Sequence, residues 1–172
     1  MLKINAGCEH RPLKDSINID LSSNSKADLI ADIENMPIRN DVVDGILCWG
    51  VLEHVNSPMR ILKEFKRVIK DHGLLKLAVP NIHTLPRITW NIKDPLNYRS
   101  SDPTDNVNGF DKKILNNLFI LNGFKALKYE YFEDPYFWHK RKNIFRFFEC
   151  LIPIPLKYRG LSVIARSLKK NG

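Results

Sequence analysis

The sequence has few cysteines, no long apolar run and no glycine-rich dinucleotide motif, and each absence excludes a class of protein. Cys8, Cys48 and Cys150 stand singly, so neither a metal knuckle nor a redox pair is expected and the thiols should be reduced. No apolar stretch approaches the ~20 residues that span a bilayer, and the first residues show no signal-peptide pattern. We therefore expect a soluble, cytoplasmic protein without a bound metal.

Acidic residues are scarce in the last third of the chain. Residues 1–110 carry 14 Lys/Arg and 14 Asp/Glu, whereas residues 111–172 carry 13 and 5, so the whole net charge of +8 lies there. An anionic partner is thus expected to meet that end. With 172 residues, 44% of them apolar, the chain suits one α/β domain, and residues 1–172 are predicted to form it.

Short apolar runs bounded by turn residues recur along the first half, which is typical of buried strands in a parallel sheet. The predicted strands are residues 2–6, 17–21, 27–31, 45–49 and 74–79. Between the last two, residues 59–70 place apolar side chains at helical spacing, so a helix is predicted there. Ser57 is expected to cap it, Pro58 suits its first position, and Gly73 lies beyond its end.

The second half adds one helix and two strands. Residues 111–122 are predicted as a helix that stops at Gly123, and residues 125–132 and 161–168 as strands flanking an insertion, 133–160. Strands that alternate with helices predict an α/β, Rossmann-like architecture.

Two links between the early strands are too short for a crossover helix, which normally needs a dozen residues or more. Residues 8–16 join the first two strands, and residues 22–26 join the second to the third. We therefore expect the first helices to be shortened or missing and one sheet face to be bare. A partner subunit, as in a homodimer, or the C-terminal insertion is expected to cover that face.

Ligand-binding residues are predicted where the first three strands end. Gly7 lets the backbone approach a ligand closely, with its amides available to polar groups. Asp20 ends the second strand and Asp32 the third, at the edge where doubly wound sheets bind ligands. One carboxylate suits ribose hydroxyls and the other an adenine amino group, while Ile33 and Met36 are expected to offer apolar contact to the purine. The pattern indicates an adenosine site.

Two related nucleotide and nucleic-acid motifs are absent. The dinucleotide fingerprint would need glycines at two positions that hold Glu9 and Pro12, which disfavours an oxidoreductase. The fourth strand leads into Trp49-Gly50-Val51-Leu52, without the Asn/Asp-Pro-Pro-aromatic motif of DNA amino-methylating enzymes. Nucleic acid is accordingly an unlikely substrate.

These segments together resemble the class I S-adenosylmethionine-dependent methyltransferases, especially the small type-11 group. The resemblance runs along nearly the whole chain and ends in that family's final hairpin, whose sheet is mostly parallel with an antiparallel last strand. The segments that carry it, in family order, are Ile4-Asn5-Ala6-Gly7-Cys8, Ile17-Asn18-Ile19-Asp20, Ala31-Asp32-Ile33-Glu34-Asn35-Met36-Pro37, Val43-Asp44-Gly45-Ile46, Val51-Leu52-Glu53-His54-Val55, residues 64–73, and Asn122-Gly123-Phe124.

The resemblance implies that the cofactor is S-adenosyl-L-methionine. The implied cofactor-binding residues are, for the methionine part, Ala6, Gly7 and Cys8; for the ribose, Asp20 with Leu21 beside it; for the adenine, Asp32 and Ile33; and near the sulfonium, Trp49 and Gly50. The chain departs from the family at Glu9, where a second glycine is usual, and in lacking the first helix, whose dipole favours the cofactor carboxylate. Arg11 or Lys14 is expected to replace that interaction.

Methyl transfer from a sulfonium is an in-line displacement that rests on orientation and exclusion of water, so no obligatory nucleophile is expected. A hydroxyl acceptor would gain from a base, and His54 and His83 follow strands four and five, where the methyl should lie. The alternatives are a helix-start hydrogen bond for His54 and a solvent-exposed loop position for His83.

Two long segments bear on the acceptor. Residues 83–110 either shape the acceptor pocket or form a lid that orders with ligand. Residues 139–152 predict a basic, aromatic amphipathic helix. This helix is expected either to lie on an anionic membrane or to pack on the sheet or a second subunit, and binding to nucleic acid is a third alternative.

The leading hypothesis for the function is methyl transfer to a small-molecule, glycan or lipid-linked acceptor. The alternative is a catalytically inactive, methyltransferase-like binding or assembly module.

Overall fold

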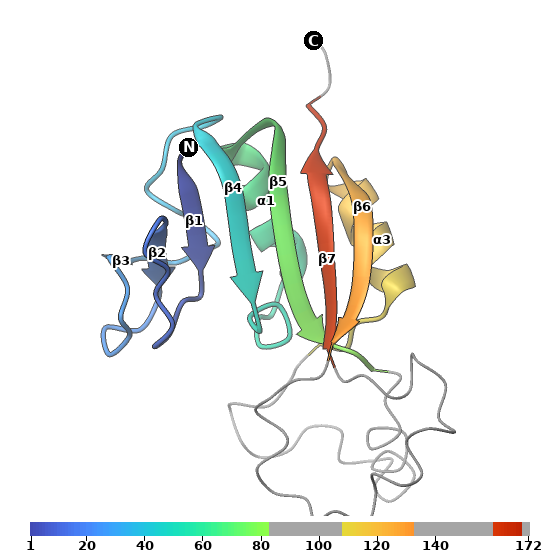
Figure 1. The fold of residues 1–172 in the computed structure, drawn as a ribbon, viewed down its shortest axis with the longest axis horizontal. Coiled ribbons are helices and arrows are strands. Elements are labelled where there is room, and N and C mark those ends of the chain that lie inside the picture. Colours follow the sequence, from blue (N-terminus) through green and yellow to red (C-terminus); the bar gives the residue numbers. More distant parts are fainter. Residues whose placement is uncertain (83–107, 133–159, 170–172) are drawn as a thin grey trace, which may run out of the picture.

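A seven-stranded sheet organises the computed structural model, which describes residues 1–82, 108–132 and 160–169 (Figure 1). Its strand order is β3-β2-β1-β4-β5-β7-β6. The strands are β1 (Lys3–Ala6), β2 (Ile17–Asp20), β3 (Leu29–Ile30), β4 (Val43–Trp49), β5 (Ile69–Pro80), β6 (Phe124–Phe132) and β7 (Gly160–Ser167). Neighbours from β3 to β5 pair in parallel, and β7 is antiparallel to both β5 and β6. The predicted mostly parallel sheet with an antiparallel last strand is confirmed.

Both described helices, α1 (Pro58–Val68) and α3 (Lys112–Leu121), lie on the same face of the sheet (Figure 1). The apolar stripe of α1 is fully buried against strand residues such as Leu75 and Leu77. α3 begins with Asp111, whose Oδ1 accepts the Ile114 amide at 2.7 Å. The sheet and these two helices enclose the hydrophobic core.

Several predicted boundaries were wrong, and the helix before β5 shows why. α1 ends at Val68, two residues earlier than predicted, and Ile69 directly begins β5 by pairing with Val43. Gly73 therefore lies inside β5 and does not stop the helix. Ser57 holds the N-cap position, yet its side chain makes no capping hydrogen bond, while Pro58 is at the first turn as expected. The third strand is also shorter than predicted, since only Leu29 and Ile30 pair with β2.

The link from β1 to β2 contains no helix, as predicted, and the buried Asn18 holds it in place. Asn18 Oδ1 accepts from Leu13 N at 2.7 Å and from Asn5 Nδ2 at 3.0 Å. Its Nδ2 donates to Leu13 O at 3.1 Å and to Asp28 Oδ2 at 2.7 Å. One side-chain amide thus supplies hydrogen-bond partners for backbone groups of the loop, which in a helix would bond to one another.

Acid is expected to destabilise this loop. The hydrogen bond from the Asn18 backbone N–H, and after it the one from the Asn18 side-chain amide, lower the pKa of Asp28 below its ordinary value of 3.8. A carboxyl with a depressed folded-state pKa stabilises the fold above its unfolded pKa, and that stabilisation is lost as pH falls through the folded value. Denaturant titrations should therefore show a larger stability difference between wild type and Asp28→Asn at pH 5 than at pH 3. An equal difference at both pH values would contradict this assignment.

The sheet face opposite α1 and α3 carries no helix among the described residues (Figure 1). Side chains of β5 alternate accordingly: Leu75 and Leu77 are buried under the helices, whereas Leu74 and Lys76 are exposed. The expected bare face is therefore present, and whether a partner subunit or the C-terminal insertion covers it stays a prediction.

Candidate functional site

Gly7 forms a tight turn where β1 ends, at the lower edge of the sheet in Figure 1. Its φ of 70° lies in the left-handed region, and a Cβ built on it would stand 2.3 Å from Val51 Cγ2. The expectation of available amides was wrong, because the Gly7 and Cys8 N–H groups both donate to Ile19 O, at 2.8 and 3.2 Å. The turn therefore offers a ligand close approach to the backbone, whereas its Gly7 and Cys8 amides are already used.

Substituting Gly7 by alanine should cost about 2 kcal/mol of unfolding free energy, from left-handed strain and crowding against Val51. In a Val51→Ala background the crowding is gone, so the same substitution should cost only the strain, about 1 kcal/mol. A double-mutant cycle by chemical denaturation measures this coupling. Purely additive losses would show that Val51 does not enforce the glycine.

Asp20 lies next to this turn at the end of β2 and is half-buried. Its Oδ2 accepts the Glu9 amide at 2.8 Å and its Oδ1 accepts the Ser22 amide at 2.9 Å. These bonds fix the carboxylate in place, and each oxygen keeps acceptor capacity for a further hydroxyl. Burial first, and then the Asp20 charge, raise the pKa of Cys8, so that side chain remains a thiol.

Glu9 occupies the position where the family usually has a glycine, and its backbone has kept a glycine-like conformation. Its φ is 49°, in the left-handed region that side chains rarely adopt. The side chain forms an exposed ion pair with Arg11 at 3.7 Å. Glu9 therefore adopts at this position a backbone conformation that glycine adopts readily.

The predicted adenine contacts lie beyond β3. Asp32 is exposed, and its Oδ1 accepts the Glu34 amide at 2.8 Å in a local turn. Ile33 is buried in the core at 8% exposure, which leaves it little surface for a purine, whereas Leu21 is 72% exposed. Because β2 and β3 are parallel neighbours, Asp20 and Asp32 share one edge. Their joint role at an adenosine stays a prediction.

An aromatic pair stands at the same edge, near the end of β4. The rings of Trp49 and Phe132 lie with centroids 5.0 Å apart at 57°. Gly160 makes this possible, since a Cβ there would fall 2.3 Å from the Phe132 ring. Gly50 follows Trp49 with φ 66°, and its N–H donates to Ala78 O at 2.9 Å. Trp49 and Gly50 thus lie near the Gly7 turn, across the β1–β4 pair.

Sequence reasoning missed two residues of the turn after β4. Glu53 is only 3% exposed, and its Oε1 would lie 3.5 Å from a Cβ on Gly50. Asn108 closes the turn from far along the chain, donating through Nδ2 to Leu52 O at 3.1 Å and Val55 O at 2.6 Å. A carboxylate inside a short apolar segment was the only sequence signal for Glu53.

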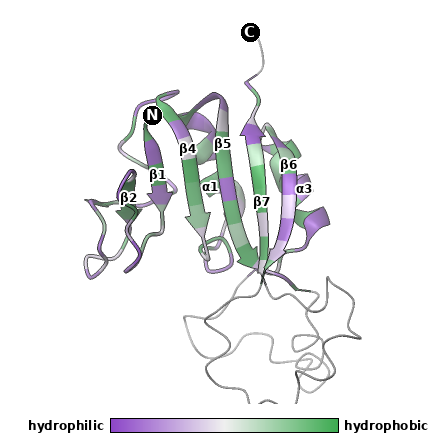
Figure 2. Ribbon diagram, in the orientation of Figure 1, coloured by the Kyte–Doolittle hydropathy of each residue, from purple (hydrophilic) through white to green (hydrophobic). Residues whose placement is uncertain are grey.

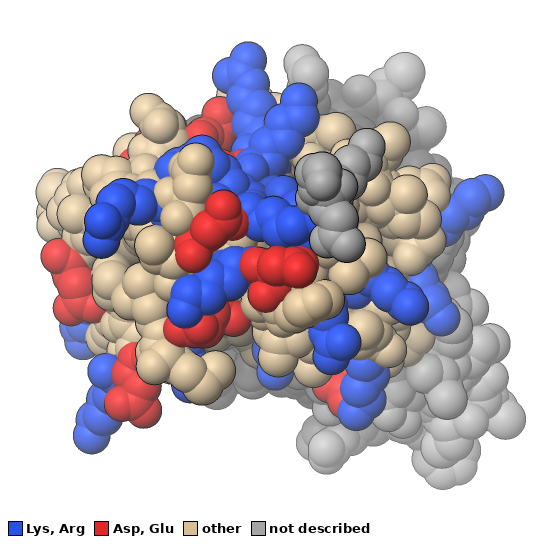
Figure 3. Space-filling view, turned by 90° about the horizontal axis from the view of Figure 1, so that it is seen from above, with Lys and Arg blue, Asp and Glu red and all other residues tan. Residues whose placement is uncertain are grey.

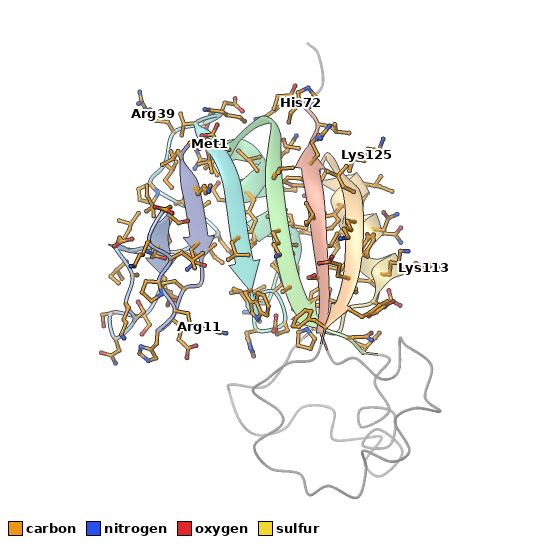
Figure 4. All side chains as sticks on the ribbon, in the orientation of Figure 1. Met1, Arg11, Arg39, His72, Lys113 and Lys125 are labelled. Carbon is orange, nitrogen blue, oxygen red and sulfur yellow. The ribbon has the colours of Figure 1, made fainter. Side chains whose placement is uncertain are left out.

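The other predicted site residues are His54, Arg11, Lys14 and His83. His54 is exposed, and its backbone N–H donates to Val51 O at 3.0 Å in a turn. Arg11 lies at the carboxyl edge, where Asn5 Nδ2 donates to its carbonyl at 3.0 Å (Figure 4). Lys14 instead lines a hollow on the bare face. His83 lies outside the described residues, as do most of the predicted loop 83–110 and the insertion 133–160, so their roles stay predictions.

Residues 7–77 match a family model described as "Methyltransferase domain". That segment holds the Gly7 turn, Asp20, Asp32 and the turn after β4. This segment is similar to the type-11 methyltransferase domain.

Solved structures extend this likeness to the whole methyltransferase fold. A SAM-dependent methyltransferase from Methanosarcina mazei superposes with a TM-score of 0.72 at 17% identity, covering 98% of this chain and 93% of that one. Another, from Archaeoglobus fulgidus, gives 0.70 at 17% identity, covering 96% and 86%. At these identities the likeness shows the fold, which is the class I methyltransferase fold.

Two uncharacterized proteins of Methanocaldococcus jannaschii are relatives in sequence. One is 37% identical over 57 residues, which are 33% of this chain and 25% of that protein. The other is 28% identical over 143 residues, 72% of this chain and 57% of that protein. The chain therefore matches about a quarter of the length of the first relative and somewhat more than half of the length of the second.

The residues of the methyltransferase domain fit an adenosyl cofactor. The Gly7 turn excludes any side chain of its own, so backbone is exposed to close approach beside Asp20. The Asp20 oxygens face that turn with acceptor capacity left. Hydroxyl donors, such as those of a ribose, are what this arrangement can bind.

Proposed function

We propose that this chain binds S-adenosyl-L-methionine at the ends of β1, β2 and β4 and transfers its methyl group to a small-molecule, glycan or lipid-linked acceptor. The observation that carries the proposal is the Asp20 carboxylate, pinned by two backbone amides directly beside the Gly7 turn. A fixed carboxylate is an acceptor prepared for both ribose hydroxyls, because no rotamer freedom is lost when they bind.

The chain's own residues have positioning roles in this proposal. When bound, the cofactor supplies a methyl group activated by its sulfonium. Asp20 accepts from the ribose, Gly7 admits the methionine part, and the half-buried Trp49 excludes water from the reacting side. His54 is exposed next to this edge, where it could take a proton from an acceptor hydroxyl.

Calorimetric titration with S-adenosyl-L-methionine and S-adenosylhomocysteine tests the proposal. One site per chain is expected for each ligand, with a dissociation constant in the micromolar range or below. Absence of heat for both ligands at millimolar excess would refute cofactor binding.

Vesicle sedimentation with anionic and neutral lipids separately tests peripheral membrane contact through residues 139–152, a segment outside the described residues.

A catalytically inactive binding module is the second candidate, and one observation favours it. The amides of Gly7, Cys8 and Glu9 are all used internally, which leaves few donors for a cofactor carboxylate. Radiolabelled methyl transfer to acceptor pools of small metabolites, glycans and lipids distinguishes the two. Cofactor binding without transfer to any pool would favour the module. Neither helix that the structure describes is long and apolar enough to cross a membrane.

A further inference from the structure

The bare sheet face combines apolar and basic side chains in register. Neighbouring strands align two rows of residues on this face across β1, β4, β5, β7 and β6, and all of them except the buried Asn5 are exposed or half-buried. The first row is Lys3, Gly45, Leu74, Arg166 and Lys125, and the second is Asn5, Leu47, Lys76, Ile164 and Lys128. In Figure 2, β5 is a hydrophobic strand interrupted by a hydrophilic band, whereas β1 and β6 are largely hydrophilic.

A hollow of about 430 Å³ opens on this face between the strands and the β1–β2 link. Its apolar surface includes Leu13 and Leu74, which are 41% and 47% exposed. Its charged lining residues are Lys3, Lys14 and Lys76 together with one acid, Asp15, so the lining carries a net positive charge. The hollow therefore joins an apolar floor to a basic rim, in the place where a doubly wound sheet usually carries helices.

The lysines of this hollow differ from other lysines near the amino ends of the strands. At the amino ends, basic and acidic side chains lie next to one another (Figure 3), as in Lys70 with Asp44 at 2.8 Å and Lys169 with Asp41. Lys3, Lys14 and Lys76 form no ion pair with any residue that the structure describes. Lys76 acts on the nearby Glu130, whose pKa its charge helps to lower, and Asp15 offsets one further charge. The positive charge that remains in the lining can meet an acidic partner.

We propose that this hollow binds an amphipathic, acidic α-helix of a partner protein. Its apolar side chains cover Leu13 and Leu74, and its carboxylates meet Lys3, Lys14 and Lys76. A second copy of the chain would bring like charges together on this face. Nucleic acid offers charge without an apolar surface for the two leucines, and a flat bilayer cannot enter a hollow. The proposal is independent of cofactor binding.

The probe is a fluorescently labelled synthetic peptide with Leu and Glu at helical spacing, titrated with the full chain by anisotropy at physiological salt. A scrambled peptide of the same composition, an oligonucleotide of equal charge and anionic vesicles are the comparison ligands. The amphipathic peptide is expected to bind at least about tenfold more tightly than the scrambled one. Equal binding of both peptides, or tighter binding of oligonucleotide or vesicle, would overturn the proposal.

Variants locate the binding to the hollow. Gly45→Leu fills it, and the fold should tolerate this change, since a Cβ there meets only Leu74 O at 3.6 Å and Lys3 Cγ at 3.9 Å. Gly45→Leu and Lys76→Glu should each weaken the peptide about tenfold. Lys113→Glu, the same charge change on α3 across the sheet (Figure 4), should have less than about a twofold effect.

Three results would contradict the hollow as the site. Gly45→Leu could bind the peptide like wild type, with thermal unfolding showing that it is folded. Lys113→Glu could weaken binding as much as Lys76→Glu, which would reduce the effect to net charge. Sedimentation of the chain alone could show a dimer that Gly45→Leu converts to monomer, which would make a second copy the occupant.

Discussion

The Asp20→Asn variant is expected to bind S-adenosyl-L-methionine about 100-fold more weakly than wild type. Hydrogen bonds to a charged acceptor are worth about 1.5–3 kcal/mol, and 1.4 kcal/mol is tenfold in affinity. Asparagine keeps the shape but loses the charge, and one of its two termini becomes a donor facing the Glu9 or Ser22 amide. Calorimetry of the purified variant measures the loss.

Asp15→Asn is the matched control for this variant. Asp15 precedes the same strand, β2, and is exposed at its opposite end, so the charge change is equal but distant from Gly7. Its affinity should stay within about twofold of wild type. If Asp15→Asn lost as much affinity as Asp20→Asn, or if a folded Asp20→Asn lost none, the carboxylate would not be the ribose acceptor.

Replacing Arg67 by alanine is expected to cost about 3–5 kcal/mol of unfolding free energy. Arg67 and Glu64 on α1 pair through two bonds, Nε to Oε2 at 2.7 Å and Nη2 to Oε1 at 2.5 Å. The guanidinium also donates to Met36 O at 3.0 Å and Ile38 O at 2.7 Å, which ties the segment after Asp32 to the helix. Removing it leaves the Glu64 carboxylate, 8% exposed, without its cation.

Arg60→Ala, on the same helix, provides the comparison. Arg60 pairs with Glu34 at 3.7 Å, and its side chain is 74% exposed, so its loss should cost under about 1 kcal/mol. Urea unfolding followed by circular dichroism compares the two variants. Equal, small losses for both would mean that the Arg67 network does not hold the segment.

Local patterns predicted the parts of this fold that depend on neighbouring residues. The turn at Gly7 and the carboxylate at Asp20 each follow a short buried strand, so their places at the sheet edge were predictable from strand ends alone. The missing early helices followed from link length. The antiparallel direction of β7 followed from the family resemblance, because no local pattern specifies that this strand inserts between β5 and β6.

Contacts between distant residues account for what the sequence did not show. The apolar spacing of α1 continues through Ile69, and only its pairing with Val43 in the sheet ends the helix there. The Gly7 and Cys8 amides are taken by Ile19 O, a partner that depends on strand register. Asn108 meets the Glu53 turn from more than fifty residues away, which no periodicity reveals.

The central claim is that Asp20 and Asp32 bind the same adenosyl group beside the Gly7 turn. A crystal structure of the complex with S-adenosylhomocysteine tests it most directly. The account predicts both ribose hydroxyls within hydrogen-bond distance of the Asp20 carboxylate and the adenine amino group at Asp32. An adenosyl group bound elsewhere, with these two carboxylates facing solvent, would contradict it.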